Sequence, residues 1–247
     1  MTSTPARLRA DLAALGPYFA VETHQPGSPV PGPWQPLGEL LSSPDALAAR
    51  IGEVRDRLAA AAGRPASGVE FRVAASIAQL GLCARLLSPA LGAAASGWAL
   101  PVDTAQARWI PSLGGPFGLS LPETASRVAA GTGTAECLRL VDGPIGQIVR
   151  AVASMAVSPQ VLWGNVASAA NGAATMIAAA RPDLAPAAAG AAGVILGYPA
   201  LAGTHLGRPG TGFRRRNCCL IYRISPPGTA RYCGDCVLGH RPASLRR

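Results

Sequence analysis

The sequence contains no lysine, few aromatic residues and few charges. All 22 basic residues are arginine, aromatic residues make up 5% of the 247 positions, and charged residues make up 14%. With 49% hydrophobic residues the chain can bury a sizeable core, in one large domain or in two small ones. This composition excludes a disordered chain and a collagen-like chain.

The chain also lacks a recognisable signal segment. Arg7, Arg9 and Asp11 interrupt the first fifteen residues, which argues against a secretory signal and predicts a cytoplasmic protein. The uncharged stretches 151–180 and 184–205 are long enough to cross a membrane, but they consist mainly of Ala and Gly and contain Pro. We therefore expect buried helices and no membrane span, while peripheral association with a membrane stays open.

The positive charge is concentrated at the C-terminus. Residues 210–247 contain eight Arg and one Asp, which gives +7 of the net charge of +9. The other 209 residues carry only +2. The pI of about 10.1 would fit binding of nucleic acid over the whole surface. The uneven distribution favours instead one local site with a negative group in or near it.

Prolines and helix caps divide the chain into three parts. The Pro-rich stretch 25–33 separates a short opening helix from the body, so residues 1–42 are expected to form an N-terminal helix and a connector. Residues 43–209 are predicted to form a helical body, and residues 210–247 a separate Arg- and Cys-rich segment.

The body shows repeated helix signals and one hairpin. The segments 107–110 and 117–121 flank turn residues and predict two short strands. The expected helices run from 43 to about 63, from 68 to Ser88, from 142 to about 157, from 158 to about 181, and onward from Pro182. The sequence therefore predicts a mainly α fold with a small β-hairpin element.

Four of the six cysteines lie within nineteen residues. Cys218 and Cys219 are adjacent, and thirteen residues separate them from Cys233 and Cys236. Two Cys-rich halves within loop reach of each other are typical of a metal or cluster site. Structural zinc is an alternative, but zinc sites leave about two to four residues between the ligands of each half. A cytoplasmic chain keeps its thiols reduced, which weakens a disulfide pairing.

The arginines around these cysteines fit an iron–sulfur cluster. Four thiolates on an oxidised two-iron core give a net charge of about −2, which falls to about −3 on reduction. Arg214, Arg215, Arg216, Arg223 and Arg231 would offset that charge and stabilise the reduced form. Under the alternative interpretation these arginines are a solvated basic tail.

Two predicted helices carry polar stripes. The stripes are Arg72, Ser76, Gln79 and Cys83 on one helix, and Asn165, Ser168, Asn171 and Thr175 on the other. Facing each other, they form either a buried hydrogen-bonded seam or the wall of a polar cleft. The seam is slightly favoured because buried polar groups need partners. In the cleft, Arg72 and Asn165 would contact substrate.

The remaining cysteines and histidines give weaker signals. Cys83 and Cys137 are isolated, as small buried hydrophobes usually are. The three histidines show no metal-ligand spacing, although His240 lies four residues after Cys236 and could tune a cluster.

The block 213–223, Phe-Arg-Arg-Arg-Asn-Cys-Cys-Leu-Ile-Tyr-Arg, and the Cys-Gly-Asp-Cys at 233–236 resemble the C-terminal cluster segment of the FhuF-like ferric siderophore reductases. Residues 72–76 and 162–165 are similar to shorter patterns of that family, so the resemblance covers about 68–238. The family usually has about ten residues between its cysteine pairs, and the extra length here fits the turn at 225–228.

The resemblance implies a C-terminal [2Fe-2S] segment at 210–247, with the cluster bound by Cys218, Cys219, Cys233 and Cys236. It also implies one-electron reduction of ferric siderophores in the cytoplasm. Residues 207–212 miss the dinucleotide fingerprint, so we expect a separate electron-donor protein. No nucleic acid is expected as a partner. The alternative function is a zinc-stabilised basic module whose tail contacts nucleic acid.

Overall fold

The computed structural model describes residues 4–129, 131–225 and 232–239, and its fold is mainly helical, as the sequence predicts. The helices are α1 (Thr4–Ala13), α2 (Leu37–Ser42), α3 (Pro44–Ala61), α4 (Phe71–Ala95), α5 (Thr132–Leu140), α6 (Gly146–Ala153), α7 (Pro159–Ala180) and α8 (Ala185–Leu196). The strands are β1 (Glu22–His24), β2 (Gln35–Pro36), β3 (Trp98–Ala99), β4 (Arg108–Ile110), β5 (Gly118–Pro122), β6 (Ser126–Arg127), β7 (His205–Arg208) and β8 (Thr211–Arg215).

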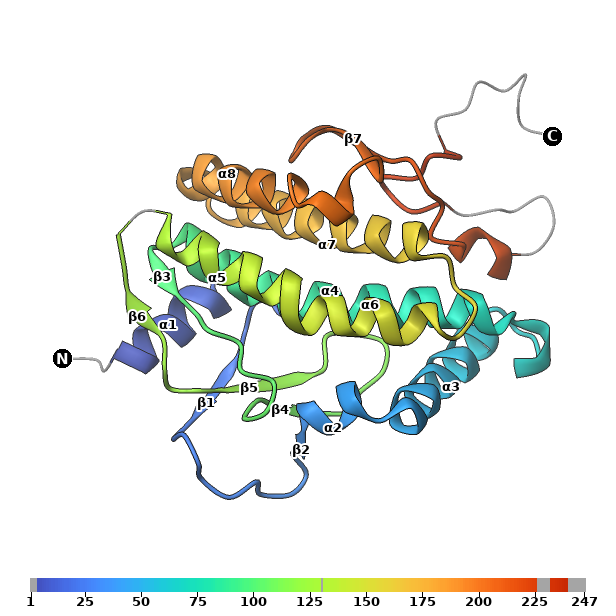
Figure 1. Ribbon diagram of the computed structural model, residues 1–247, viewed down its shortest axis with the longest axis horizontal. Coiled ribbons are helices and arrows are strands. Elements are labelled where there is room, and N and C mark those ends of the chain that lie inside the picture. Colours follow the sequence, from blue (N-terminus) through green and yellow to red (C-terminus); the bar gives the residue numbers. More distant parts are fainter. Residues whose placement is uncertain (1–3, 130, 226–231, 240–247) are drawn as a thin grey trace.

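Helix α4 is the central element of the helical part (Figure 1). It packs against α3, α5, α7 and α8, and its contact with α7 is the most extensive. Apolar residues nearly surround its axis, so Leu82, Leu86 and Leu91 are buried. The predicted end at Ser88 was wrong, because α4 continues through Pro89 to Ala95. Burial of the residues after the proline offsets the backbone hydrogen bond that the proline removes.

A small sheet lies on the side of α4 opposite α7 and α8 (Figure 1). Its strand order is β1-β5-β4-β2. Strands β4 and β5 form the predicted antiparallel hairpin, in which Trp109 pairs with Leu119. Both side chains are buried, and β1 joins β5 in parallel. The hairpin places the loop between Ile110 and Gly118 beside α3 and α4.

The helix expected to begin at Asp142 begins earlier, at Thr132. It widens into a π-helical turn over Val141–Ile145 and continues as α6. Pro144 lies within this turn, and a wide turn accommodates a residue without a backbone N–H. The helices expected from 158 and 182 are confirmed as α7 and, after the turn Pro182–Leu184, as α8.

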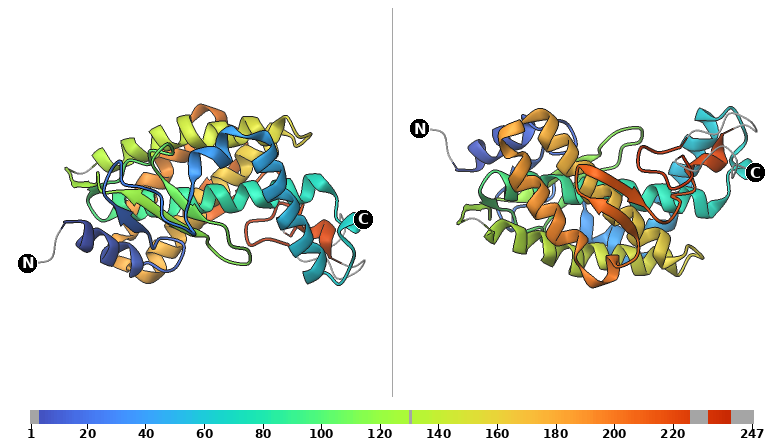
Figure 2. Two further views of the ribbon diagram at one scale, coloured as in Figure 1. Left: turned by 90° about the horizontal axis from the view of Figure 1, so that it is seen from below. Right: turned by 90° about the horizontal axis from the view of Figure 1, so that it is seen from above.

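The hairpin of β7 and β8 leads the chain from α8 to the cysteine-rich segment (Figure 2). His205 pairs with Arg215, so the hairpin extends across the expected boundary at 209/210. The segment lies beside the connection between α3 and α4, where Arg64 donates a hydrogen bond to the carbonyl of Ile224 at 2.9 Å.

Helix α4 is the one helix among the described residues that is long and apolar enough to cross a membrane. Inside the protein, 78% of its apolar window is buried. Such burial is typical of the core helix of a folded domain.

Candidate metal centre

Two short segments bring the four C-terminal cysteines to one end of the molecule. One segment follows β8 and carries the adjacent pair, and the other spans residues 232–239. The backbone N–H of Arg215 donates to the carbonyl of Asp235 at 3.0 Å and joins the two. The carboxylate of Asp235 accepts a hydrogen bond of 2.6 Å from Ser168 on α7. Both segments are therefore fixed to each other and to the helical body.

Three of the thiols form a hydrogen-bonded group centred on Cys219. The Sγ atoms of Cys219 and Cys233 are 3.6 Å apart. Two thiolates on one tetrahedral metal with 2.3 Å bonds are separated by about 3.8 Å, so this spacing suits metal binding. Hydrogen bonding with Cys218 and Cys233 lowers the pKa of Cys219, and the same interactions raise the pKa of its two partners. Cys219 is thus the thiol that ionises most readily.

Backbone amides stabilise sulfur in both halves of the segment. The N–H of Leu220 donates to Sγ of Cys218, and the N–H of Leu238 donates to Sγ of Cys236, each at 3.3 Å. Leu220 adopts φ = 72°, a left-handed conformation that turns the chain directly after the cysteine pair. Hydrogen bonds to sulfur stabilise the negative charge of a thiolate. In both halves, the N–H that stabilises a cysteine sulfur belongs to the residue two positions after that cysteine.

The four cysteines differ in exposure. Cys219 and Cys236 are buried, whereas Cys218 and Cys233 are half-buried. All four are free thiols in the structure. One edge of the group is therefore accessible from solvent.

Arg215 is the buried arginine whose charge acts on these sulfurs, and it is 1% exposed. Its Nε donates to the carbonyl of Asn217 at 3.0 Å, and its Nη2 donates to that of Val161 at 3.2 Å. Its Nη1 is buried and has no hydrogen-bond partner among the residues that the structure describes. The positive charge of Arg215 contributes to the lowered pKa of Cys219. This guanidinium is positioned to offset negative charge on the cysteines.

The other arginines of the expected patch are separated from Arg215. Arg214 and Arg216 are exposed, since successive residues of a strand point to opposite faces. Arg223 and Arg72 both form ion pairs of 2.6 Å with Glu70. The ion pair between Arg223 and Glu70 joins the cysteine-rich segment to the start of α4. Arg231 and His240 lie outside the described residues.

Only part of the two polar stripes forms a seam between the helices. Ser168 binds Asp235, Asn171 accepts a hydrogen bond from the N–H of Gly210, and Thr175 is exposed. Asn165, Ser76 and Gln79 are fully buried. The amide nitrogen of Asn165 donates to Ser76 Oγ at 3.1 Å and to Gln79 Oε1 at 2.8 Å. Ser76 in turn donates to the carbonyl of Cys219 at 3.0 Å. The structure thus places Asn165 in a sealed contact between α4 and α7 and not on a cleft, while Arg72 lies outside the seam on the surface.

Three residues hold the segment: Ser168 binds Asp235, Glu70 binds Arg223, and Ser76 binds the backbone of Cys219. Sequence reasoning missed Glu70, and it placed Ser76 and Ser168 on the polar stripes without linking them to the cysteine segment. One signal was present, because Asp235 is the single acid of the basic C-terminal segment. Ser76 and Ser168 were visible as polar residues on apolar helices, but the sequence did not show which residues they bind.

The isolated cysteines are buried away from this group. Burial raises the pKa of Cys137 to about 12 and also raises the pKa of Cys83. Both thiols remain protonated at neutral pH, as expected for small buried hydrophobes.

Residues 215–238 match a family model described as the FhuF 2Fe-2S C-terminal domain. The chain has the C-terminal domain of an FhuF-like protein. The cofactor of this FhuF-type domain is a [2Fe-2S] cluster, which decides against the zinc alternative. Neither a curated protein nor a solved structure matches the chain.

The described residues of the FhuF-type domain fit this cofactor. Four thiols, two N–H···S bonds and a buried guanidinium suit a group that is held by thiolates and carries negative charge. Within residues 4–129, 131–225 and 232–239, no group of three or more His, Cys, Asp or Glu side chains is arranged to hold a single metal ion. A [2Fe-2S] core distributes its four thiolates over two irons and does not require three donors around one point.

Proposed function

We propose that this FhuF-type protein is a ferric siderophore reductase and that Cys218, Cys219, Cys233 and Cys236 are its cluster ligands. The observation that carries the proposal is the accessible edge formed by Cys218 and Cys233 within an FhuF-type domain. Electron transfer to a dissolved chelate requires close approach, and a cluster domain with an open edge permits it. The cytoplasm is part of the same proposal, as the resemblance to the FhuF-like reductases implies.

The chain's own residues supply the environment for this reaction. Arg215 places a fixed positive charge beside Cys219, and the N–H groups of Leu220 and Leu238 add partial positive charge at two sulfurs. These groups favour the more negative, reduced state. When bound, a [2Fe-2S] cluster held by these cysteines would supply one electron, which would convert the substrate's Fe(III) to Fe(II); oxygen donors hold Fe(II) less firmly, so the metal would be released.

The electron is proposed to come from another protein. Residues 207–212 form the tip of the β7–β8 hairpin and not the strand-to-helix turn that binds dinucleotide phosphates. This glycine-rich motif therefore serves a β-hairpin and not a nicotinamide cofactor, so the proposed electron source is a separate protein.

A single-turnover measurement tests the function. Anaerobically purified holoprotein is reduced with dithionite, freed of excess reductant and mixed with a ferric siderophore. The visible absorbance of the oxidised cluster should return while a chromogenic chelator traps one Fe(II) per cluster. The gallium(III) complex of the same siderophore should leave the cluster reduced, because gallium(III) accepts no electron under these conditions. A cluster that stays reduced in the presence of several ferric chelates would show that the proposed function is wrong.

A further inference from the structure

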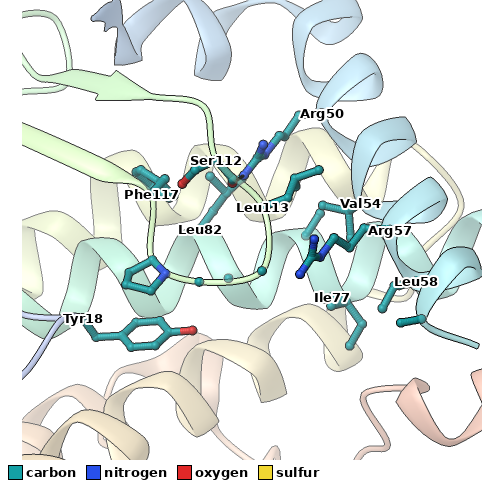
Figure 3. Close-up of a pocket in the computed structure, with 16 residues that line it drawn as sticks. Tyr18, Arg50, Val54, Arg57, Leu58, Ile77, Leu82, Ser112, Leu113 and Phe117 are labelled. Carbon is teal, nitrogen blue, oxygen red and sulfur yellow. Dashed lines mark hydrogen bonds between the residues drawn. The ribbon is translucent and has the colours of Figure 1, made fainter. Parts of the chain in front are cut away.

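A second face of helix α4 borders two cavities of about 350 Å³ each. Tyr18, Ile77 and Gly81 line both cavities, so the two adjoin along α4 and are treated as one groove. We call it the α4 groove and define it by Tyr18, Arg57, Ile77, Gly81, Ser168 and Gly172. Figure 3 shows the first cavity, with Tyr18 on one side and Arg57 on the other.

Two helical glycines keep the groove open. Gly81 lies within α4 and Gly172 within α7, where glycine costs about 1 kcal/mol of stability relative to alanine. A Cβ atom at either position would meet no atom within 4 Å. A larger residue would fit at either position, so close packing of the helices does not explain these two glycines. Their missing side chains leave space for a ligand between the two helices.

The groove combines apolar walls with unpaired polar groups. Arg57 is exposed and forms no hydrogen bond or ion pair with any residue that the structure describes. In Figure 3 its guanidinium points toward the turn between Leu113 and Phe117. The hydroxyl of Tyr18 points toward the same cavity, and within the described chain it has no hydrogen-bond partner. A cation and a hydroxyl over apolar walls suit an oxygen-rich anion with an apolar body.

One end of the groove reaches the cluster domain. Ser168 lines the second cavity and donates to Asp235, which lies between Cys233 and Cys236. Through this hydrogen bond the second cavity is connected to the cysteine segment by one side chain.

We propose that the α4 groove binds the ferric chelate, as an anionic, oxygen-rich ligand with an apolar body, and holds it beside the cluster domain. Arg57 pairs with a peripheral carboxylate or phenolate oxygen, Tyr18 donates a hydrogen bond, and the walls contact the hydrocarbon linkers. This inference rests on the proposed function for the identity of the ligand, but its test involves no electron transfer.

Binding of redox-inert complexes to the oxidised holoprotein provides that test. The probes are the anionic gallium(III) complex of a tricatecholate siderophore and the uncharged gallium(III) complex of a trihydroxamate, both titrated by calorimetry. Gly81→Leu projects a side chain into the groove and should weaken binding of both probes by more than tenfold. Arg57→Glu should weaken binding of the anionic probe by about tenfold and change binding of the uncharged probe less.

Two variants serve as matched controls. Gly52→Leu makes the same change on α3 at a glycine that also has open space around its Cβ position but lines neither cavity. Arg150→Glu reverses an exposed arginine on α6, away from the groove. Both controls should bind the probes as the wild type does, and thermal unfolding should confirm that all four variants fold.

The outcomes separate this inference from the proposed function. Unchanged binding in Gly81→Leu, equal weakening in Gly52→Leu, or no binding by the wild type would each overturn the groove assignment, even if the wild type reduces ferric siderophores. Groove-dependent binding of gallium complexes by a protein that reduces no ferric siderophore would keep the groove and refute the reductase.

Discussion

The helical body and the cluster domain are stabilised in different ways. In the body, α4 and α7 bury long rows of apolar side chains around one core. In residues 215–238 of the described chain, the buried side chains are Arg215, Cys219 and Cys236. Hydrophobic burial is the main favourable contribution to folding. The body therefore stabilises itself, whereas the cluster domain depends on its cofactor and on a few hydrogen bonds to the body.

The largest effect should come from losing a proposed ligand. Cys219→Ala removes one thiolate, so we expect loss of the visible cluster absorbance and rapid proteolysis within the C-terminal domain. The body should keep its far-ultraviolet circular dichroism and its main thermal transition. Cys137→Ser, at a buried cysteine away from the group, should keep full cluster absorbance. Full occupancy in Cys219→Ala would refute the ligand assignment.

Arg215 links the charge of the cluster domain to the packing of the body. Arg215→Gln removes a positive charge and leaves the carbonyls of Asn217 and Val161 without their donor. We expect a loss of about 3 kcal/mol in the free energy of unfolding. We also expect a lower reduction potential, on the order of 60 mV, for a Coulomb contribution of about 1.4 kcal/mol.

Arg214→Gln and Arg216→Gln provide the comparison, because both side chains are exposed. Screening by solvent should leave their potentials within about 15 mV of the wild-type value. Protein-film electrochemistry measures all three variants. Equal shifts at the three positions would mean that the arginines act as one diffuse patch and not through Arg215.

The seam should have an intermediate effect. Ser76→Ala removes the hydrogen bond to the Cys219 carbonyl and one acceptor of Asn165, so we expect a loss of about 1–2 kcal/mol in denaturant unfolding. The cluster should also be lost faster on dilution or exposure to air. A Ser88→Ala control removes a hydroxyl that bonds only within α4, to Ala84, and should not change the rate of cluster loss.

The smallest effect concerns Glu70 at the surface. Hydrogen bonds from Arg223 and Arg72 lower the pKa of its carboxyl group. Because the folded pKa is below the unfolded one, the ion pairs contribute above the unfolded pKa, and their contribution is lost as pH falls through the folded pKa. Exposed pairs contribute under about 1 kcal/mol. Glu70→Gln should therefore increase proteolysis of the cluster domain slightly at pH 7, and this difference from wild type should disappear in acid.

The sequence predicted the parts of this structure that local patterns determine. The Ser158-Pro159 cap gave the start of α7, and the cysteine spacing together with the FhuF-like block gave the cofactor. It could not predict the passage of α4 through Pro89, because that depends on burial by other helices. Nor could it separate Arg215 from Arg214 and Arg216, because three adjacent arginines show no alternation until β8 assigns them to faces. The groove likewise depends on how α4 and α7 pack.

Each cysteine pair contributes one inner and one outer sulfur. Cys219 and Cys236 are buried against the body, while Cys218 and Cys233 face outward. The two pairs share this arrangement although one has no spacer and the other has two residues between its cysteines. The domain thus has a polarity: the more buried sulfurs lie on one flank and the more exposed sulfurs on the other. A redox partner that docks on the outer flank would meet sulfur before it meets the protein core.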